Sequence, residues 1–353
     1  MKMTKPAPAA LASAEALVAA GLIAPAHAEA IGKVVRTYAI GVTGTIADLI
    51  DREDPHDPIA RQFIPDPQEL LVAPEERADP IGDADASPLD GIVHRYPDRV
   101  LLKLLHICPV YCRFCFRRET VGPGSPAHLS AAALDRAFGY IANHSEIWEV
   151  ILTGGDPLVL SERRLDDIFA RLRGIPHVRI IRIHTRVPVV EPSLVTAELV
   201  ETMRACGKTL YVVLHANHPR EFTQAARAAC SRLVDAGIPM LSQSVLLRGV
   251  NDDVEILAQL MRSFVEMRIK PYYLHHPDLA RGTAHFRLSI AEGRRIVEAL
   301  HGRLSGLCQP RYMLDIPGGF GKVPIGANAI RGDESGYEVT DFRGMTHAYP
   351  PPA

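Results

Sequence analysis

The stretch LLKLLHICPVYCRFCFRRETVG, residues 101–122, ends an apolar run with three cysteines on one short loop. They have the spacing C-x3-C-x2-C and are Cys108, Cys112 and Cys115. Three thiolates this close in sequence can bind three irons of a four-iron, four-sulfur cluster, whereas a ferredoxin supplies a fourth cysteine. Because the other three cysteines are scattered singly, we expect one open iron. A zinc site completed by His94 or His106 is the alternative.

An aromatic residue precedes each of the second and third cysteines, namely Tyr111 and Phe114. With this feature the loop resembles the cluster motif of radical S-adenosylmethionine (SAM) enzymes. The resemblance implies that the open iron binds the amino and carboxylate groups of SAM. It also implies that an electron from the cluster cleaves SAM into methionine and a 5′-deoxyadenosyl radical.

Composition narrows the class of protein further. The chain has 353 residues and a net charge of −2, so its charge gives no reason to expect nucleic acid as a partner. The one basic cluster, at residues 113–118, is interleaved with the cysteines and indicates a carboxylate or phosphate site. No run of about twenty apolar residues predicts a membrane span. The N-terminus resembles a secretory signal superficially, but Glu15 interrupts it and residues 13–17 predict a capped helix.

The expected location is therefore cytoplasmic, where a reducing environment protects an oxygen-labile cluster and unpaired thiols.

Four regions follow one another along the chain. Residues 1–50 predict a small helical N-terminal region, and the Asp- and Pro-rich residues 51–93 predict an ordered arm. Residues 94–305 predict the main α/β domain, and residues 306–353 form a C-terminal segment.

A regular alternation of short apolar runs and helical segments starts at residue 100. Predicted strands lie at 100–107, 148–154, 178–185, 209–216, 240–247 and 270–276. Predicted helices lie near 130–143, 161–172, 194–205, 220–236, 252–267 and 289–302, with Ser130 and Ser161 as caps of the first two. A βαβ repeat of this length predicts a parallel sheet buried on both faces.

Such a repeat could form a doubly wound sheet or a barrel, and the positions of the reactive residues favour the barrel. Cysteines, acids, histidines and Gln243 follow or end successive predicted strands. Active groups gathered at one rim are typical of a barrel. We therefore predict a partial six-stranded (β/α) barrel, which is also the fold that the radical SAM resemblance implies.

Gly154, Gly155 and Asp156 follow the second predicted strand. Glycines permit a close approach of backbone to a ligand, and the Asp156 carboxylate can meet an ammonium group. The motif resembles the Gly-Gly-acid element that holds the amino group of SAM in radical SAM enzymes. The alternative is a plain Gly-Gly turn.

The C-terminal segment RYMLDIPGGFGKVPIG, residues 311–326, presents Lys322 on a glycine loop. It is not a P-loop, because Val323 follows the lysine. A lysine on such a loop suits pyridoxal 5′-phosphate (PLP), since the side chain must move when a substrate amine displaces it.

Together with HRYPDR (94–99), TGGDPL, TRVPVVEP, HANHP, LLRGVND and the C-x3-C-x2-C loop, this segment is similar to the lysine 2,3-aminomutase family over roughly residues 45–330. The resemblance implies that Lys322 binds PLP, that Arg99 binds its phosphate and that Tyr96 lies beside it. It implies further that Arg117 binds the substrate carboxylate. Asp278 and Asp315 then bind the ε-ammonium of lysine.

Two acids opposite an arginine select a substrate with a carboxylate at one end and a cation at the other. The resemblance therefore predicts the conversion of L-α-lysine to β-lysine. The chain ends at Ala353, and in length it is more similar to the short branch whose members make (R)-β-lysine for elongation factor P, so we expect that role. Free β-lysine for osmoprotection or catabolism, and an aminomutase for another amino acid, are alternatives. A metal-binding module without catalysis is the alternative from another class.

Several partners follow from these expectations. They are an electron donor such as flavodoxin or ferredoxin, a functional link to elongation factor P and its β-lysine ligase, and a second copy of the chain in a homo-oligomer. Four histidines receive no individual role, although one or two could contact SAM or PLP: His94, His184, His215 and His285.

Overall fold

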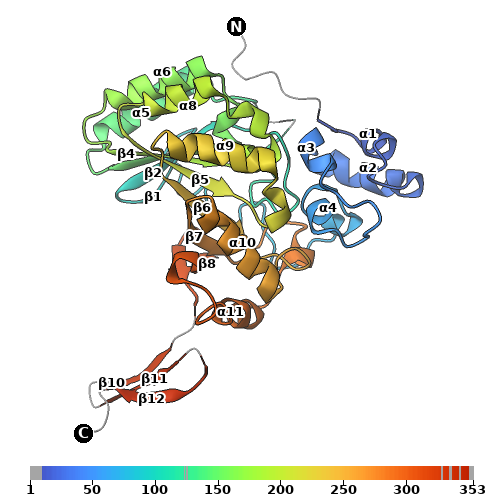
Figure 1. The fold of residues 1–353 in the computed structure, drawn as a ribbon. Helices are drawn as coiled ribbons and strands as arrows, with labels where there is room; N and C mark the ends of the chain where they lie inside the picture. Colours follow the sequence, from blue (N-terminus) through green and yellow to red (C-terminus); the bar gives the residue numbers. More distant parts are fainter. Residues whose placement is uncertain are drawn as a thin grey trace.

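The computed structural model of the protein describes residues 10–122, 124, 126–326, 329–333, 336–341 and 343–349. One sheet of nine strands, in the order β1 to β9, forms an almost closed barrel (Figure 1). The strands are β1 (Ile92–Tyr96), β2 (Arg99–Leu105), β3 (Glu149–Gly154), β4 (Ile180–Thr185), β5 (Thr209–His215), β6 (Met240–Val245), β7 (Ile269–His275), β8 (Arg311–Ile316) and β9 (Gly321–Pro324).

The six predicted strands are confirmed as β2 to β7, which are parallel throughout. The sheet extends beyond them at both edges. Strand β8 adds a seventh parallel strand beside β7, and β1 and β9 close the edges as antiparallel neighbours of β2 and β8. Strands β8 and β9 belong to the segment expected to carry Lys322, so the sheet itself continues into that segment.

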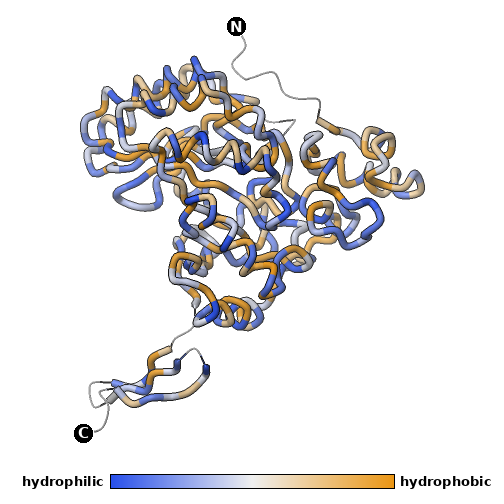
Figure 2. The backbone as a smooth tube through the Cα atoms, viewed as in Figure 1, coloured by the Kyte–Doolittle hydropathy of each residue, from blue (hydrophilic) through white to orange (hydrophobic). Residues whose placement is uncertain are grey.

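Helices cover the outer face of the barrel (Figure 1). The longer ones are α5 (Ala131–Asn143), α6 (Glu162–Arg173), α8 (Ala197–Arg204), α9 (Gln224–Asp235), α10 (Val254–Glu266) and α11 (Ile290–Glu298). Ser130 and Ser161 cap α5 and α6 as predicted, each accepting a hydrogen bond from the backbone three residues on. Figure 2 shows hydrophobic and hydrophilic residues alternating along these helices. This pattern is typical of helices that pack their hydrophobic side against a sheet.

The N-terminal region forms three short helices beside the barrel, which are α1 (Ala14–Ala19), α2 (Ala28–Thr37) and α3 (Gly44–Ala47), and the arm contributes α4 (Pro58–Phe63). Helix α7 (Val187–Val190) follows β4. Short 3-10 helices complete the turns: η1 (Pro25–His27), η2 (Pro67–Leu70), η3 (Pro157–Val159), η4 (Pro192–Leu194), η5 (Pro219–Glu221), η6 (Ala284–Phe286) and η7 (Gly306–Cys308).

The arm, residues 51–93, is held on the barrel by contacts distant in sequence. Arg61 Nε donates to the Arg248 carbonyl at 2.8 Å, and the Glu76 carboxylate accepts from the Gly282 and Thr283 amides at 2.9 and 3.1 Å. Apolar residues from α1, from the arm and from the barrel strands pack into one core. Among the described residues, no helix is both long and apolar enough to cross a bilayer.

A second sheet lies apart from the barrel in Figure 1. Its antiparallel strands are β10 (Ile330–Asp333), β11 (Gly336–Thr340) and β12 (Thr346–Tyr349). Ile330, Met345 and Tyr349 are exposed on it. Three such short strands bury little apolar surface by themselves.

Candidate active site

One cavity of about 470 Å³ receives every residue that the sequence predicts for the site. The twelve residues are Tyr96, Arg99, Cys108, Cys112, Cys115, Arg117, Gly154, Gly155, Asp156, Asp278, Asp315 and Lys322. They come from β1, β2, the loop after β2, the end of β3, the segment after β7, and β8 and β9. The barrel therefore gathers groups that lie more than 220 residues apart.

The cysteine loop presents three free thiols to this cavity. Burial raises the pKa of the Cys108 thiol well above its usual value and that of Cys115 to about 11, and neighbouring cysteines add to both shifts. Thiolates at these positions therefore need a cation beside them. Among the described residues, no group of three His, Cys, Asp or Glu side chains is arranged to bind a single metal ion. A cluster instead supplies one iron to each thiolate, so the three thiols need not converge on one point. This donor set fits a [4Fe–4S] cluster.

Arg186, after β4, already places a positive charge at the loop. Its Nη1 donates to Cys112 Sγ at 3.0 Å, and its Nη2 pairs with Glu221 at 2.8 Å and with Gln62 Oε1 at 2.6 Å. Burial opposes the charge on Arg186, but Cys112 and Glu221 raise its pKa on balance. Arg186 thus connects the arm and η5 to the cysteines.

Gly154 and Gly155 lie against the backbone that carries the cysteine loop. A Cβ on Gly154 would lie 2.4 Å from the Leu105 carbonyl oxygen, and one on Gly155 would lie 2.1 Å from that of Ile107. The Gly155 amide donates to Leu105 at 2.6 Å. The two glycines therefore let β3 pack closely beside the start of this loop.

Asp156 is buried, and its carboxylate is engaged by the protein. It accepts hydrogen bonds from Thr185 Oγ1 at 2.7 Å and from the Arg186 amide at 2.7 Å. Burial raises its pKa despite these bonds. In this structure Asp156 ties β3 to β4, and its contact with the amino group of SAM stays a prediction.

Lys322, on β9, also lines the cavity. Its Nζ contacts both Asp315 oxygens, at 2.5 and 2.6 Å, and its backbone amide donates to Tyr96 Oη at 2.9 Å. His275 Nδ1 lies 3.3 Å from the same carboxylate. Arg99 stacks over the Tyr96 ring at 3.8 Å. A lysine and an arginine that both contact one tyrosine in a cavity fit PLP and its phosphate.

Asp278 and Asp315 have opposite pKa shifts. Burial, followed by repulsion from Asp315, raises the pKa of Asp278 to about 7. Burial also opposes ionisation of Asp315, but the His275 hydrogen bond and the Lys322 charge lower its pKa to about 2. Asp315 is thus ionised and paired with Lys322. Among the described residues no ion pair is found for Asp278, and the charges of Lys322 and Arg117 only partly offset the rise in its pKa.

The structure also reveals residues that the sequence did not single out. His275 ends β7, and its Nδ1 lies 3.3 Å from Asp315 Oδ2. Asp83 of the arm accepts from Arg117 Nη2 at 2.9 Å. Both contacts join segments more than thirty residues apart, so spacing along the chain gives no signal for them.

Of the four histidines without an assigned role, His184 and His215 line the cavity. Their rings are joined by a 3.3 Å contact, from His215 Nε2 to His184 Nδ1. Burial lowers the pKa of His215 to about 3 and that of His184 well below its usual value. Both are therefore neutral polar groups. His94 instead contacts Tyr140 Oη at 2.8 Å.

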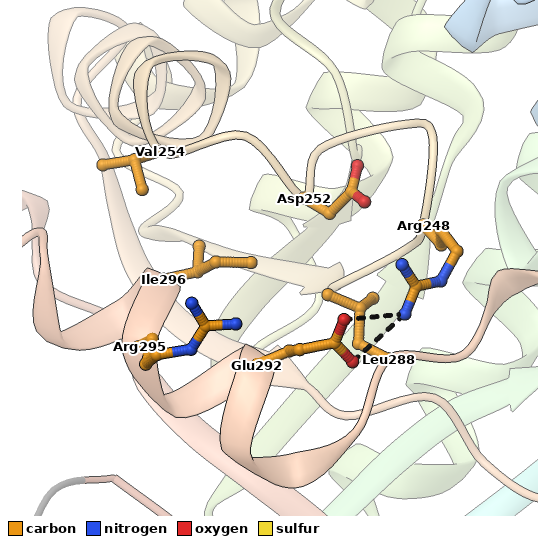
Figure 3. Close-up of a pocket in the computed structure, with 7 residues that line it drawn as sticks. All are labelled: Arg248, Asp252, Val254, Leu288, Glu292, Arg295 and Ile296. Carbon is orange, nitrogen blue, oxygen red and sulfur yellow. Dashed lines mark hydrogen bonds and ion pairs between the residues drawn. The ribbon is translucent and has the colours of Figure 1, made fainter.

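A second cavity, of about 320 Å³, lies between the loop after β6 and helix α11. It contains none of the predicted site residues. Arg248 is neutralised there by both oxygens of Glu292, at 3.1 Å each (Figure 3). The larger cavity is accordingly the candidate active site.

Comparison with known proteins agrees with this geometry. Residues 102–261 match the model of the Radical SAM superfamily. The matched segment is thus a radical SAM domain, and proteins of this class use a [4Fe–4S] cluster and SAM.

Proteins with similar sequences indicate the family of the chain within this class. The chain is 40% identical to L-lysine 2,3-aminomutase of Clostridium subterminale, over 92% of this chain and 78% of that protein. It is 35% identical to L-lysine 2,3-aminomutase of Escherichia coli, over 82% and 84%. Glutamate 2,3-aminomutase of Clostridioides difficile is 36% identical, over 84% and 70%.

The chain belongs to the lysine 2,3-aminomutase family. It is therefore an enzyme of the isomerase class, and the interpretations as a zinc site or as a metal-binding module without catalysis are wrong.

Proposed function

We propose that this enzyme moves the amino group of L-α-lysine from C2 to C3 and that it requires PLP held by Lys322. The observation that carries the proposal is the charge layout of the cavity, with Arg117 among its lining residues and Asp278 and Asp315 beside Lys322. An arginine suits the substrate carboxylate. Two acids suit a distal ammonium, which matches a basic amino acid.

The same layout argues against an acidic substrate. One relative is named glutamate 2,3-aminomutase, so identity of about this level does not itself select the amino acid. A second carboxylate on the substrate would meet Asp315, whose pKa is lowered to about 2, and would be repelled. The ε-ammonium group of a lysine substrate would instead replace Lys322 as the cation beside Asp315.

Removing hydrogen from C3 of an amino acid requires a radical, because that C–H bond is not acidic enough for a side-chain base. When bound, the cluster and SAM supply the hydrogen-abstracting radical, and PLP supplies the π system through which nitrogen migrates. Cys108, Cys112 and Cys115 would hold the cluster. Gly154, Gly155 and Asp156 would border SAM.

The remaining task of the chain is to fix the substrate at both ends. Arg117 would hold the carboxylate, while Asp278 and Asp315 would hold the ε-ammonium. Arg99 would hold the PLP phosphate, and Tyr96 would hold the backbone of Lys322 through the 2.9 Å hydrogen bond. Fixing a substrate at two points aligns one C–H bond for abstraction.

The proposal also includes the fate of the product and the partners. We propose (R)-β-lysine for modification of elongation factor P by its β-lysine ligase, with flavodoxin or ferredoxin as electron donor. Free β-lysine is the second candidate. The six free cysteines and the cluster favour a cytoplasmic location.

We further propose a homo-oligomer, because the sheet β10–β12 exposes apolar residues that a second copy could cover. Light scattering coupled to size-exclusion chromatography measures the mass directly. A monomer at micromolar concentration would contradict this part of the proposal.

The test of the reaction is an anaerobic assay of the iron–sulfur-reconstituted protein with PLP, SAM, a strong reductant and L-lysine. Chiral chromatography follows β-lysine. We expect (R)-β-lysine, no product from L-glutamate, and loss of both product and bound-PLP absorbance in Lys322→Ala. (S)-β-lysine would contradict the elongation factor role. SAM cleavage without β-lysine would contradict lysine as the substrate.

A further inference from the structure

The Asp83 carboxylate lies inside the protein although its residue belongs to the arm. It is 8% exposed, and its Oδ2 accepts from Arg117 Nε at 3.1 Å and from Nη2 at 2.9 Å. Its Oδ1 accepts from Arg95 Nη2 at 3.2 Å. Burial opposes its charge, but Arg117 lowers its pKa on balance, so the carboxylate is ionised.

These bonds fix which edge of the Arg117 guanidinium is available. A guanidinium has five N–H donors in a planar fork. The edge formed by Nε and Nη2 is occupied by Asp83, and Nη1 lies 3.4 Å from Thr153 Oγ1. The remaining edge, formed by Nη1 and Nη2, can still bind a carboxylate through two parallel hydrogen bonds. The Phe116 ring packs against the guanidinium at 4.4 Å.

The turn that carries Asp83 is itself held in place. The Asp79 carboxylate accepts from the Asp83 and Ala84 amides at 2.9 and 2.8 Å. The Asp83 carbonyl accepts from Ser87 Oγ at 2.7 Å. Asp83 can therefore orient Arg117, whose long side chain would otherwise sample many rotamers.

The same turn touches the glycine loop before Lys322. Gly82 has φ +66°, and a Cβ there would lie 2.6 Å from the Gly319 amide nitrogen. The turn thus contacts both the carboxylate-binding arginine and the loop of the proposed PLP lysine. It joins the two ends of the candidate site.

We infer that Asp83 is a positioning residue that orients Arg117 for the α-carboxylate of the substrate. This inference rests on the proposed function, in which Arg117 binds that carboxylate. Asp83 carries the same charge as the substrate group and so acts through Arg117. Its effect is therefore confined to ligands that have a carboxylate.

Two ligands separate this role from a general structural one. L-lysine has the carboxylate, and cadaverine has the two amines without it. We expect Asp83→Asn to weaken L-lysine binding to the PLP-loaded holoenzyme about tenfold or more, because the Arg117 guanidinium would no longer be aligned with the lysine carboxylate. Cadaverine affinity, also measured by calorimetry, should stay within about twofold. The KM for lysine should rise more than kcat falls.

Asp85→Asn is the matched control, because it removes the same charge from an exposed residue of the same turn region. It should change neither affinity. Asp83→Glu retains the charge and should recover part of the lysine affinity. If Asp83→Asn weakened both ligands equally, or if Asp83→Glu recovered nothing, the inference would be overturned.

A double-mutant cycle with Arg117→Ala distinguishes this inference from the proposed function. If Arg117→Ala leaves lysine affinity unchanged, the proposed carboxylate site is wrong. If it weakens lysine binding and Asp83→Asn does not, the inference alone is wrong. We expect the double variant to bind lysine as weakly as Arg117→Ala, because Asp83 has no effect without that arginine.

Discussion

Asp278 has a pKa raised to about 7 by burial and by the nearby Asp315 carboxylate. Below that pH it is protonated, so an arriving ammonium group must displace the proton. We therefore expect lysine affinity to fall as pH decreases below about 7. Near pH 6 lysine binding should release a proton, and near pH 8 it should release almost none.

Calorimetry of the PLP-loaded enzyme in two buffers of different ionisation enthalpy measures this proton release. Asp278→Asn should abolish the release at pH 6 and weaken lysine binding at pH 8, since it removes a charge-assisted contact of about 1.5–3 kcal/mol. Asp252→Asn is the control, because Asp252 lines the second cavity and not the candidate active site. Proton release that persists in Asp278→Asn would assign it to another group.

At the scale of elements, a buried ion cluster joins η2 to the cysteine loop. Glu69 is fully buried and pairs with both Arg113 and Arg118. Glu69→Gln leaves two arginines without a counter-charge, and breaking a buried pair costs about 3–5 kcal/mol. We expect a lower midpoint of chemical unfolding and less bound iron. Glu75→Gln, at a more exposed pair with Arg287, should unfold like the unmodified protein.

Close packing of β3 on the cysteine loop gives a second prediction. Gly155→Ala would place a Cβ 2.1 Å from the Ile107 carbonyl oxygen, so β3 and the loop must separate. We expect reduced iron loading and a lower melting temperature. In α5, Gly139 has nothing within 4 Å of an added Cβ. Gly139→Ala should therefore stabilise by up to about 1 kcal/mol. Normal iron content in Gly155→Ala would contradict this account.

The elements differ in how well the sequence predicts them. Strands β2 to β7 are apolar runs between amphipathic helices, and their pattern alone identifies them. Strand β9 has only four residues, and Val323 and Pro324 in it are exposed, so no apolar alternation marks it. The resemblance predicts a PLP-binding role for Lys322, which stays a prediction. The contacts that Asp83 and His275 make depend on tertiary folding and leave no local pattern.

At the scale of the whole molecule, the two ends of the barrel sheet meet at the candidate site. The arm contacts the glycine loop through Gly82 and Gly319, and Tyr96 of β1 accepts a hydrogen bond from Lys322 of β9. PLP would contact Arg99 and Lys322, and lysine would contact Arg117 and Asp315. These ligands would therefore add contacts between segments that lie far apart in the sequence.

We accordingly expect PLP with lysine to slow amide hydrogen exchange in residues 79–99 and 311–324 together, because binding suppresses local opening. The sheet β10–β12 lies apart from the barrel in Figure 1 and should exchange at an unchanged rate. Lys322→Ala should lose the protection by PLP in both segments at once. Protection of only one segment would show that the two edges of the barrel open independently.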